Sequence, residues 1–212
     1  MKVVKIEDIS TIDYLDHVSS VIYLEGCNLR CPYCYNWRLV IEKNDAIPLK
    51  EVYKRLKDNR FIDSVAITGG EPTIHPELPF FLAELRSRGY KVKLDTNGTN
   101  PEMLKNILKD MDVDYIAMDV KTDTFGYDYW FDGISNKILN SIDIIIGSRV
   151  PHEFRCTAVS PFLDKDSLIN VLSMIKGEKL ILQEPRLEDV LNPDFPMETF
   201  KYLADYKDML RP

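Results

Sequence analysis

The chain has 212 residues, with 27 lysines and arginines against 34 aspartates and glutamates, which gives a formal net charge of -7 at pH 7. This length suits one α/β domain with one sizeable core, so we expect residues 1–212 to form a single domain. The negative charge and the lack of a basic run disfavour nucleic acid as a partner, and no stretch approaches the roughly 18 apolar residues of a membrane span.

The N-terminal stretch MKVVKIEDIS has acidic residues where a signal peptide would need an apolar segment, so we expect a cytoplasmic protein. A reducing compartment favours metal binding or catalysis over disulfide bonds for clustered cysteines. Cys27, Cys31 and Cys34 form such a cluster, whereas Cys156 stands alone in a predicted strand, as expected of a small buried apolar residue.

Short β-branched runs alternate with amphipathic segments along the chain. Strands are predicted at residues 18–24, 64–68, 91–95, 115–120, 153–159 and 178–183. Helices are predicted at residues 49–56, 81–85, 103–111, 138–142 and 168–175. Asn100 followed by Pro101 predicts a helix start, Gly89 and Gly177 predict helix ends, and the aromatic stretch at residues 125–133 indicates an ordered loop.

Six β-α steps imply parallel strands, because each helical crossover returns the chain to the same end of the sheet. Polar residues follow four successive predicted strands, in the cysteine loop and in TGGEP (68–72), DTNG (95–98) and MDVKT (118–122). Parallel barrels build their sites at these strand ends, whereas a doubly wound sheet places its ligand at a switch point. Six strands are too few to close an eight-stranded barrel, so we predict an α/β fold with a partial, open TIM-like barrel of six β-α units.

The C-x3-C-x2-C spacing of the three cysteines suits a loop around a cubane iron–sulfur cluster, with each thiolate on one iron and the fourth iron left open. Two alternatives remain: a zinc knuckle completed by His75 or Cys156, or three buried thiols without metal. The chain has no second cysteine cluster, so we expect at most one such centre.

CNLRCPYC followed by ITGGEP resembles the radical S-adenosylmethionine (radical SAM) enzymes, over nearly the whole chain. The resemblance implies a radical SAM fold and a 4Fe-4S cluster on Cys27, Cys31 and Cys34, which would be both the metal ligands and the catalytic residues. In this family the open iron binds the methionine part of SAM, and one-electron reduction cleaves the sulfonium to a radical that abstracts a hydrogen atom.

The family pattern also implies roles around the methionine and adenine groups. Gly69 and Gly70 would let the backbone approach the methionine amino group, Glu71 would accept its protons, and Tyr33 would lie next to the adenine. The alternative for the Gly-Gly-Glu stretch is a tight turn with a solvated acid.

LDTNG and MDVKT resemble the glycyl radical enzyme activases, such as pyruvate formate-lyase activating enzyme. This resemblance assigns Asp95, Asn97, Asp119 and Lys121 to SAM, with a monovalent cation between the two aspartates, and it makes Arg155 a ligand of the SAM carboxylate. The alternatives are a turn at Asn97, a surface pair between Asp119 and Lys121, and a solvent-facing strand arginine.

Residues 10–36 and LILQEPR resemble the anaerobic ribonucleoside-triphosphate reductase activating proteins. Such a protein would use a flavodoxin or ferredoxin as reductant and take a hydrogen atom from a glycine of its partner reductase. The chain departs from this pattern at Leu15 and Asp16, where relatives often have Pro-Gly, and at Tyr35, where they often have His, so the docking surface is not specified by the motifs.

Two other functions stay open from the sequence. One is a small-molecule radical SAM enzyme such as 7-carboxy-7-deazaguanine synthase, although those enzymes often have Asp directly after the third cysteine, where this chain has Tyr35 and Asn36. The other is a metal-binding module with a decayed site.

Overall fold

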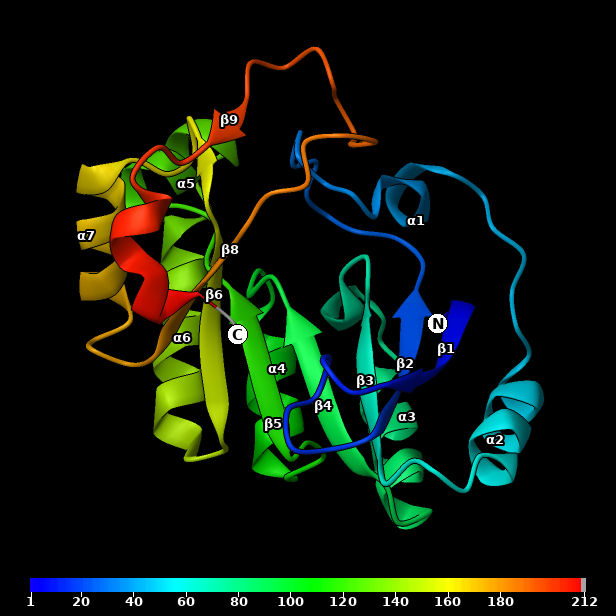
Figure 1. The fold of residues 1–212 in the computed structure, drawn as a ribbon. Helices are drawn as coiled ribbons and strands as arrows, with labels where there is room; N and C mark the ends of the chain where they lie inside the picture. The colour runs from blue at the N-terminus through cyan, green and yellow to red at the C-terminus, as the bar shows by residue number, and fades with distance from the viewer. Residues whose placement is uncertain (211–212) are drawn as a thin grey trace.

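The computed structural model describes residues 1–210, in which a seven-stranded sheet packs against helices (Figure 1). The strand order is β1-β2-β3-β4-β5-β6-β8. The strands are β1 (Val3–Ser10), β2 (Ser19–Leu24), β3 (Ser64–Gly69), β4 (Lys91–Thr96), β5 (Tyr115–Asp119), β6 (His152–Thr157) and β8 (Leu180–Gln183). Each pair from β2 to β8 is parallel, which confirms the predicted α/β fold.

Helices connect these parallel strands. They are α1 (Trp37–Ile41), α2 (Leu49–Asp58), α3 (Leu78–Ser87), α4 (Pro101–Lys109), α5 (Thr124–Trp130), α6 (Ser135–Ser148) and α7 (Lys165–Met174), with 3-10 helices η1 (Pro72–Ile74) and η2 (Leu203–Met209). A small ribbon pairs β7 (Val159–Ser160) with β9 (Glu198–Thr199). In the part of the chain that the structure describes, none of these helices has the length and apolar character that a membrane span requires.

The predicted helix signals act as expected. The Asn100 side chain accepts a hydrogen bond from the backbone N–H of Met103 at 3.2 Å, and Pro101 occupies the first turn of α4. Gly89 and Gly177 follow α3 and α7 with φ of 91° and 83°, a conformation that glycine adopts without strain.

The six predicted strands are all present, as β2, β3, β4, β5, β6 and β8, but the sequence pattern missed β1, which pairs with β2 in antiparallel orientation. Only Val3 and Ser10 are fully buried in this edge strand, and charged residues separate its apolar ones. An edge strand of this kind lacks the β-branched apolar run that marks the interior strands, so the pattern did not reveal it.

The prediction of a loop for the aromatic stretch was also wrong, because most of it forms α5. The Asp123 side chain caps this helix by accepting a hydrogen bond from Gly126 N at 2.8 Å. Gly126 packs on Thr122, whose Oγ1 would lie 2.1 Å from any added Cβ. A glycine that a sequence pattern marks as a helix breaker is here required by close packing.

The sixth β-α unit differs from the other five. Between β8 and residue 210 the structure has no α-helix, and an irregular segment leads to β9 and then to η2. We call residues 184–197 the strap. Figure 1 shows the strap crossing above the strand ends toward the loop that follows β2.

The two faces of the sheet have opposite character on its central strands. The face toward the helices is apolar and belongs to the main hydrophobic core, with Val92, Leu94, Ile116, Met118, Phe154 and Cys156. The alternate residues point to the concave side and include Lys93, Asp95, Asp119, Glu153 and Arg155. A strand sends successive side chains to opposite faces, so one short sequence serves both the core and the interior of the open barrel.

Candidate functional site

A cavity of about 320 Å³ lies at the carboxyl ends of the parallel strands. Every residue that the sequence predicted for the site lines it: Cys27, Cys31, Tyr33, Cys34, Gly69, Gly70, Glu71, Asp95, Asn97, Asp119, Lys121 and Arg155. The volume falls within the range of small-molecule sites, about 300–1,000 Å³. Loops that are far apart in sequence therefore meet around one cavity, as an open barrel requires.

The cysteine loop is tied to the loop after β4 by side-chain hydrogen bonds. Asn28 donates to Thr99 Oγ1 at 2.7 Å, and Asn97 donates to Asn28 Oδ1 at 3.1 Å. The amide of Asn97 also lies 3.8 Å from the Sγ of Cys27. These contacts fix the loop that carries the three thiols, and they give Asn97 a role in positioning the loop beyond the predicted turn or SAM contact.

Burial determines the acid–base properties of the three thiols. Burial raises the pKa of Cys27 to about 11, and it also raises the pKa of Cys31 and of Cys34. Thiols of this kind are poor free nucleophiles but become thiolate ligands when a metal supplies positive charge. In residues 1–210, no three His, Cys, Asp or Glu side chains converge on a single metal-ion position. The zinc-knuckle alternative thus receives no support from the geometry.

Gly69 and Gly70 are required by contacts between backbones. Gly69 has a φ of 118°, and a Cβ there would lie 2.4 Å from the backbone of Leu24. A Cβ on Gly70 would lie 1.8 Å from the carbonyl oxygen of Gly26. The two glycines let the end of β3 pass directly against the start of the cysteine loop.

Glu71 is 1% exposed, and its carboxylate accepts hydrogen bonds from neighbouring loops. Oε1 accepts from Thr73 N at 3.0 Å and from Thr96 Oγ1 at 2.7 Å, and Oε2 accepts from Asn97 N at 2.6 Å. Burial raises its pKa, while these hydrogen bonds act in the opposite direction. Glu71 therefore joins the β3 loop to the β4 loop, and its contact with a methionine amino group stays a prediction.

Four charged side chains alternate in sign across the cavity. The guanidinium of Arg155 lies between two carboxylates, with Nε 2.8 Å from Asp119 Oδ1 and Nη1 3.4 Å from Asp95 Oδ2. Lys121 Nζ lies 3.5 Å from Asp119 Oδ2. Arg155 thus faces the concave side as predicted, and the Asp119–Lys121 pair belongs to this cavity and not to an isolated surface contact.

The pKa values follow from this pairing. Burial alone would raise the pKa of Asp95, but Arg155 and Lys93 outweigh it and hold the pKa below its ordinary value. Burial alone would lower the pKa of Lys121, yet the nearby Asp119 and Cys31 keep it well above its ordinary value. These groups are therefore charged at neutral pH, which suits recognition of a zwitterionic amino acid.

The strap closes one side of the cavity. Its backbone donates hydrogen bonds from Leu191 to the carbonyl of Cys34 at 3.1 Å and from Asn192 to the carbonyl of Pro32 at 3.0 Å. Asp189 accepts hydrogen bonds from Arg38 at 2.7 Å and from Trp37 at 3.2 Å. A segment near the C-terminal end thus covers the cysteine loop.

Several residues of the cavity were not predicted from the sequence. They include Asp13, Tyr23, Thr68, Thr96, Thr157, Gln183, Glu184 and Arg186. Thr96 holds Glu71, and the Tyr127 hydroxyl accepts a hydrogen bond from the backbone N–H of Lys121 at 2.7 Å. The LILQEPR motif contained Gln183, Glu184 and Arg186, and only the position of the strap shows that they face the cavity.

The departures from the expected motif lie in two places. Tyr35 lines the cavity, and its ring lies 5.0 Å from the guanidinium of Arg186. Leu15 and Asp16 lie at the opposite end of the barrel, in the turn between β1 and β2. Asp16 has a φ of 65°, so the position keeps the backbone conformation that a glycine would supply.

The residues present fit an iron–sulfur cluster with SAM. Cys27, Cys31 and Cys34 supply soft sulfur ligands from one fixed loop, and the charged side chains beside them match the amino and carboxylate groups of a methionine. The guanidinium of Arg155 lies between Asp95 and Asp119, in the place where a monovalent cation was predicted.

Comparisons with known proteins agree with this chemistry. Residues 21–157 match the family model described as the Radical SAM superfamily. The chain is 35% identical over 198 residues to a protein of Methanocaldococcus jannaschii that carries a provisional name as a glycyl-radical enzyme activating enzyme, and the match covers 90% of this chain and 82% of that protein.

A shorter match and a solved structure complete the comparison. The chain is 43% identical over 82 residues to a 7-carboxy-7-deazaguanine synthase of Aquifex aeolicus, which covers 38% of this chain and 36% of that enzyme. A domain of a pyruvate-formate lyase-activating enzyme from Bacteroides vulgatus superposes with a TM-score of 0.52 at 19% identity, covering 67% of this chain and 88% of that domain. At 19% identity, the superposition supports a similarity of fold alone.

Proposed function

The chain belongs to the radical SAM superfamily, and on that premise we propose that it activates a glycyl radical enzyme by removing a hydrogen atom from a glycine of its partner. The observation that carries the proposal is the 35% identity to the Methanocaldococcus jannaschii relative, which runs through 90% of the chain. The chain is an enzyme, and in this proposal the glycine of the partner enters the open side of the barrel.

The chain's own residues have distinct tasks in this proposal. Cys27, Cys31 and Cys34 hold a 4Fe-4S cluster, which together with SAM supplies one-electron cleavage of the sulfonium. Arg155 and Lys121 bind the methionine carboxylate, and Asp95 and Asp119 orient those cations.

The remaining residues shape and protect the site. Glu71 holds the β3 and β4 loops together, so that Gly69 and Gly70 present their backbone to the methionine amino group. Tyr33, which lines the cavity, would contact the adenine, and the strap would exclude water from the cysteine loop. The proposal includes no monovalent cation, because the Arg155 guanidinium fills the place between the two aspartates.

The partner in this proposal is an anaerobic ribonucleoside-triphosphate reductase, and the reductant is a flavodoxin or ferredoxin. The support for this partner is the resemblance of residues 10–36 to the corresponding activating proteins. The Asp16 departure does not argue against it, since the turn conformation is retained and lies away from the cavity.

The test is a spin-resonance assay after anaerobic reconstitution with iron and sulfide. We expect a persistent glycyl radical signal only when protein, reductant, SAM and the reductase are all present. The matched control is a reductase whose radical-bearing glycine is replaced by alanine. SAM cleavage without any radical on the intact reductase would overturn the proposal.

A second candidate is synthesis of 7-carboxy-7-deazaguanine, favoured by the 43% identity over 82 residues to the Aquifex aeolicus enzyme. That match covers little more than a third of the chain, and Tyr35 follows the third cysteine where those enzymes often have Asp. Faster SAM turnover on addition of 6-carboxytetrahydropterin would favour this candidate, and no response removes it.

A further inference from the structure

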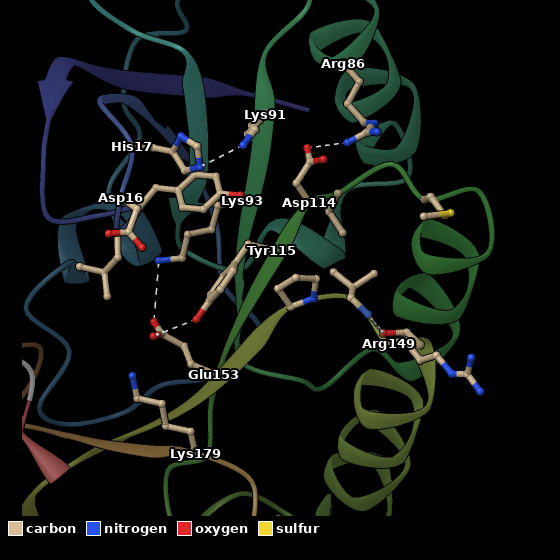
Figure 2. A pocket seen from close by; sticks show the side chains of 17 residues that line it. Asp16, His17, Arg86, Lys91, Lys93, Asp114, Tyr115, Arg149, Glu153 and Lys179 are labelled. Carbon is tan, nitrogen blue, oxygen red and sulfur yellow. Dashed lines mark hydrogen bonds and ion pairs between the residues drawn. The ribbon is translucent and has the colours of Figure 1, made fainter. Parts of the chain in front are cut away.

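A lysine is buried inside the barrel, where an apolar residue would be expected. Lys93, on β4, is 2% exposed, and Glu153, on β6, is 1% exposed. Both residues line a separate cavity of about 850 Å³ at the amino ends of the strands, and Figure 2 shows their side chains pointing toward each other. Charged side chains are rarely buried unless they are paired, so Lys93 and Glu153 are expected to have partners of opposite charge.

Lys93 has two acidic partners, one on each side of it along the barrel. Its Nζ lies 4.0 Å from Glu153 Oε1 and 3.2 Å from Asp95 Oδ1, and it also donates to the carbonyl of Asp13. Lys93 and Asp95 are two residues apart on one strand, so both project to the concave face. Lys93 thus lies directly beneath a residue of the candidate site.

The pairing continues upward into that site. Asp95 Oδ2 lies 3.4 Å from Arg155 Nη1, Arg155 Nε lies 2.8 Å from Asp119 Oδ1, and Asp119 Oδ2 lies 3.5 Å from Lys121 Nζ. Charges therefore alternate without a break along one ladder: Glu153, Lys93, Asp95, Arg155, Asp119 and Lys121. Glu153 and Lys93 face the cavity at the amino ends of the strands, and the other four residues face the candidate site.

We propose that Lys93 is a positioning residue for SAM: by holding Asp95 from below, it fixes the Arg155 guanidinium in the orientation that receives the methionine carboxylate. A carboxylate between two cations stays between them, whereas a carboxylate with one cation moves toward it. Without Lys93, Asp95 would draw Arg155 away from Asp119 and compete with the substrate carboxylate. This inference rests on the proposed function only in naming SAM as the ligand.

The test compares SAM affinity in reconstituted protein by calorimetry. Lys93→Met alone leaves Glu153 buried without its lysine and can fail to fold, so the decisive variant is Lys93→Met with Glu153→Gln, which removes both lower charges. We expect this double variant to fold and to load its cluster. Its dissociation constant for SAM should rise about tenfold or more, because the Arg155 guanidinium is no longer held in the orientation that receives the carboxylate.

A purely structural role would leave a different signature. With the positioning role, the KM for SAM in reductant-driven cleavage should rise while kcat stays within about threefold, because the residue touches no reacting atom. The control is Lys91→Met, the same substitution on the same strand, at an exposed lysine that contacts His17 instead of the ladder. Its SAM affinity should match that of the unsubstituted protein.

Different results would contradict the proposed function and the positioning role of Lys93. If the unsubstituted protein, with its cluster loaded, binds no SAM, the proposed function is wrong. If the unsubstituted protein binds SAM and the folded, loaded double variant binds it equally tightly, Lys93 has no positioning role.

Discussion

On β4 and β6, apolar residues that face the helices alternate with charged residues that point to the concave side. Phe154 and Cys156 belong to the hydrophobic core, and their neighbours Glu153 and Arg155 belong to the charge ladder inside the barrel. Burial of the apolar face stabilises the fold by roughly 25 cal/mol per Å² of apolar surface, while the charged face must be fully paired to be tolerated. On these strands the residues of the hydrophobic core thus alternate with the residues proposed to recognise the ligand.

The largest difference in activity is expected between a cysteine of the loop, Cys31, and the core cysteine, Cys156. Cys31→Ala removes one of three predicted cluster ligands, so we expect loss of the cluster absorbance and of SAM cleavage together. Cys156→Ala, on the helix-facing side, should keep both and cost only about 1 kcal/mol of unfolding free energy. Iron and sulfide analysis with a cleavage assay measures the difference. SAM cleavage that survives in Cys31→Ala would contradict the site.

Adjacent residues on β6 allow a second contrast. Arg155→Met removes the cation between Asp95 and Asp119, and we expect SAM affinity to fall about tenfold or more. Phe154→Leu should leave affinity unchanged but lower the unfolding free energy by about 1–2 kcal/mol. Calorimetry and denaturant unfolding on both variants are the measurements. An equal loss of SAM affinity in both variants would mean that the helix-facing side and the concave side of β6 do not have separate roles.

Gly70, which lines the cavity, and Gly147, in α6, should also differ in their tolerance of a side chain. Gly70→Ala places a Cβ against the Gly26 carbonyl, so the cysteine loop must shift, at a cost of about 1–3 kcal/mol and with weaker cluster retention. Gly147→Ala, in α6, meets nothing within 4 Å and should be neutral or stabilise by up to about 1 kcal/mol. Thermal unfolding and bound iron distinguish them. Retention of iron at the unsubstituted level in Gly70→Ala would argue against a fixed loop.

The smallest effect is expected at the strap. Asp189→Asn weakens an exposed contact with Arg38, which should leave the free energy of unfolding nearly unchanged but should speed bleaching of the cluster in air. Asp143→Asn, which breaks an exposed pair with Lys176, is the matched control and should not affect bleaching. Bleaching at the same rate in both variants would deny the strap a protective role.

The sequence predicted the parallel strands and the residues around the cavity, because both depend on local patterns. β-branched runs mark buried strands, and Cys27, Gly70, Glu71 and Asp119 stand in short motifs at strand ends. The structure brings all of these to one cavity, although their binding roles stay predictions.

Pairings between distant segments could not be predicted in the same way. The edge strand β1 is recognised only by its pairing with β2, and α5 forms because Asp123 caps a stretch that contains a glycine. The KVKLD pattern gives no sign that Lys93 is buried, and only the tertiary structure places it against Glu153. Contacts of this kind arise from tertiary packing, which no local pattern records.

A spin-resonance spectrum of the reduced, iron- and sulfide-loaded protein, recorded with and without SAM, asks directly whether the three thiols hold a cluster that SAM can reach. We expect a cluster signal whose g values change when SAM is added. A spectrum that SAM leaves unchanged, or a protein that takes up about one zinc ion and no acid-labile sulfide, would contradict a radical SAM site in this cavity.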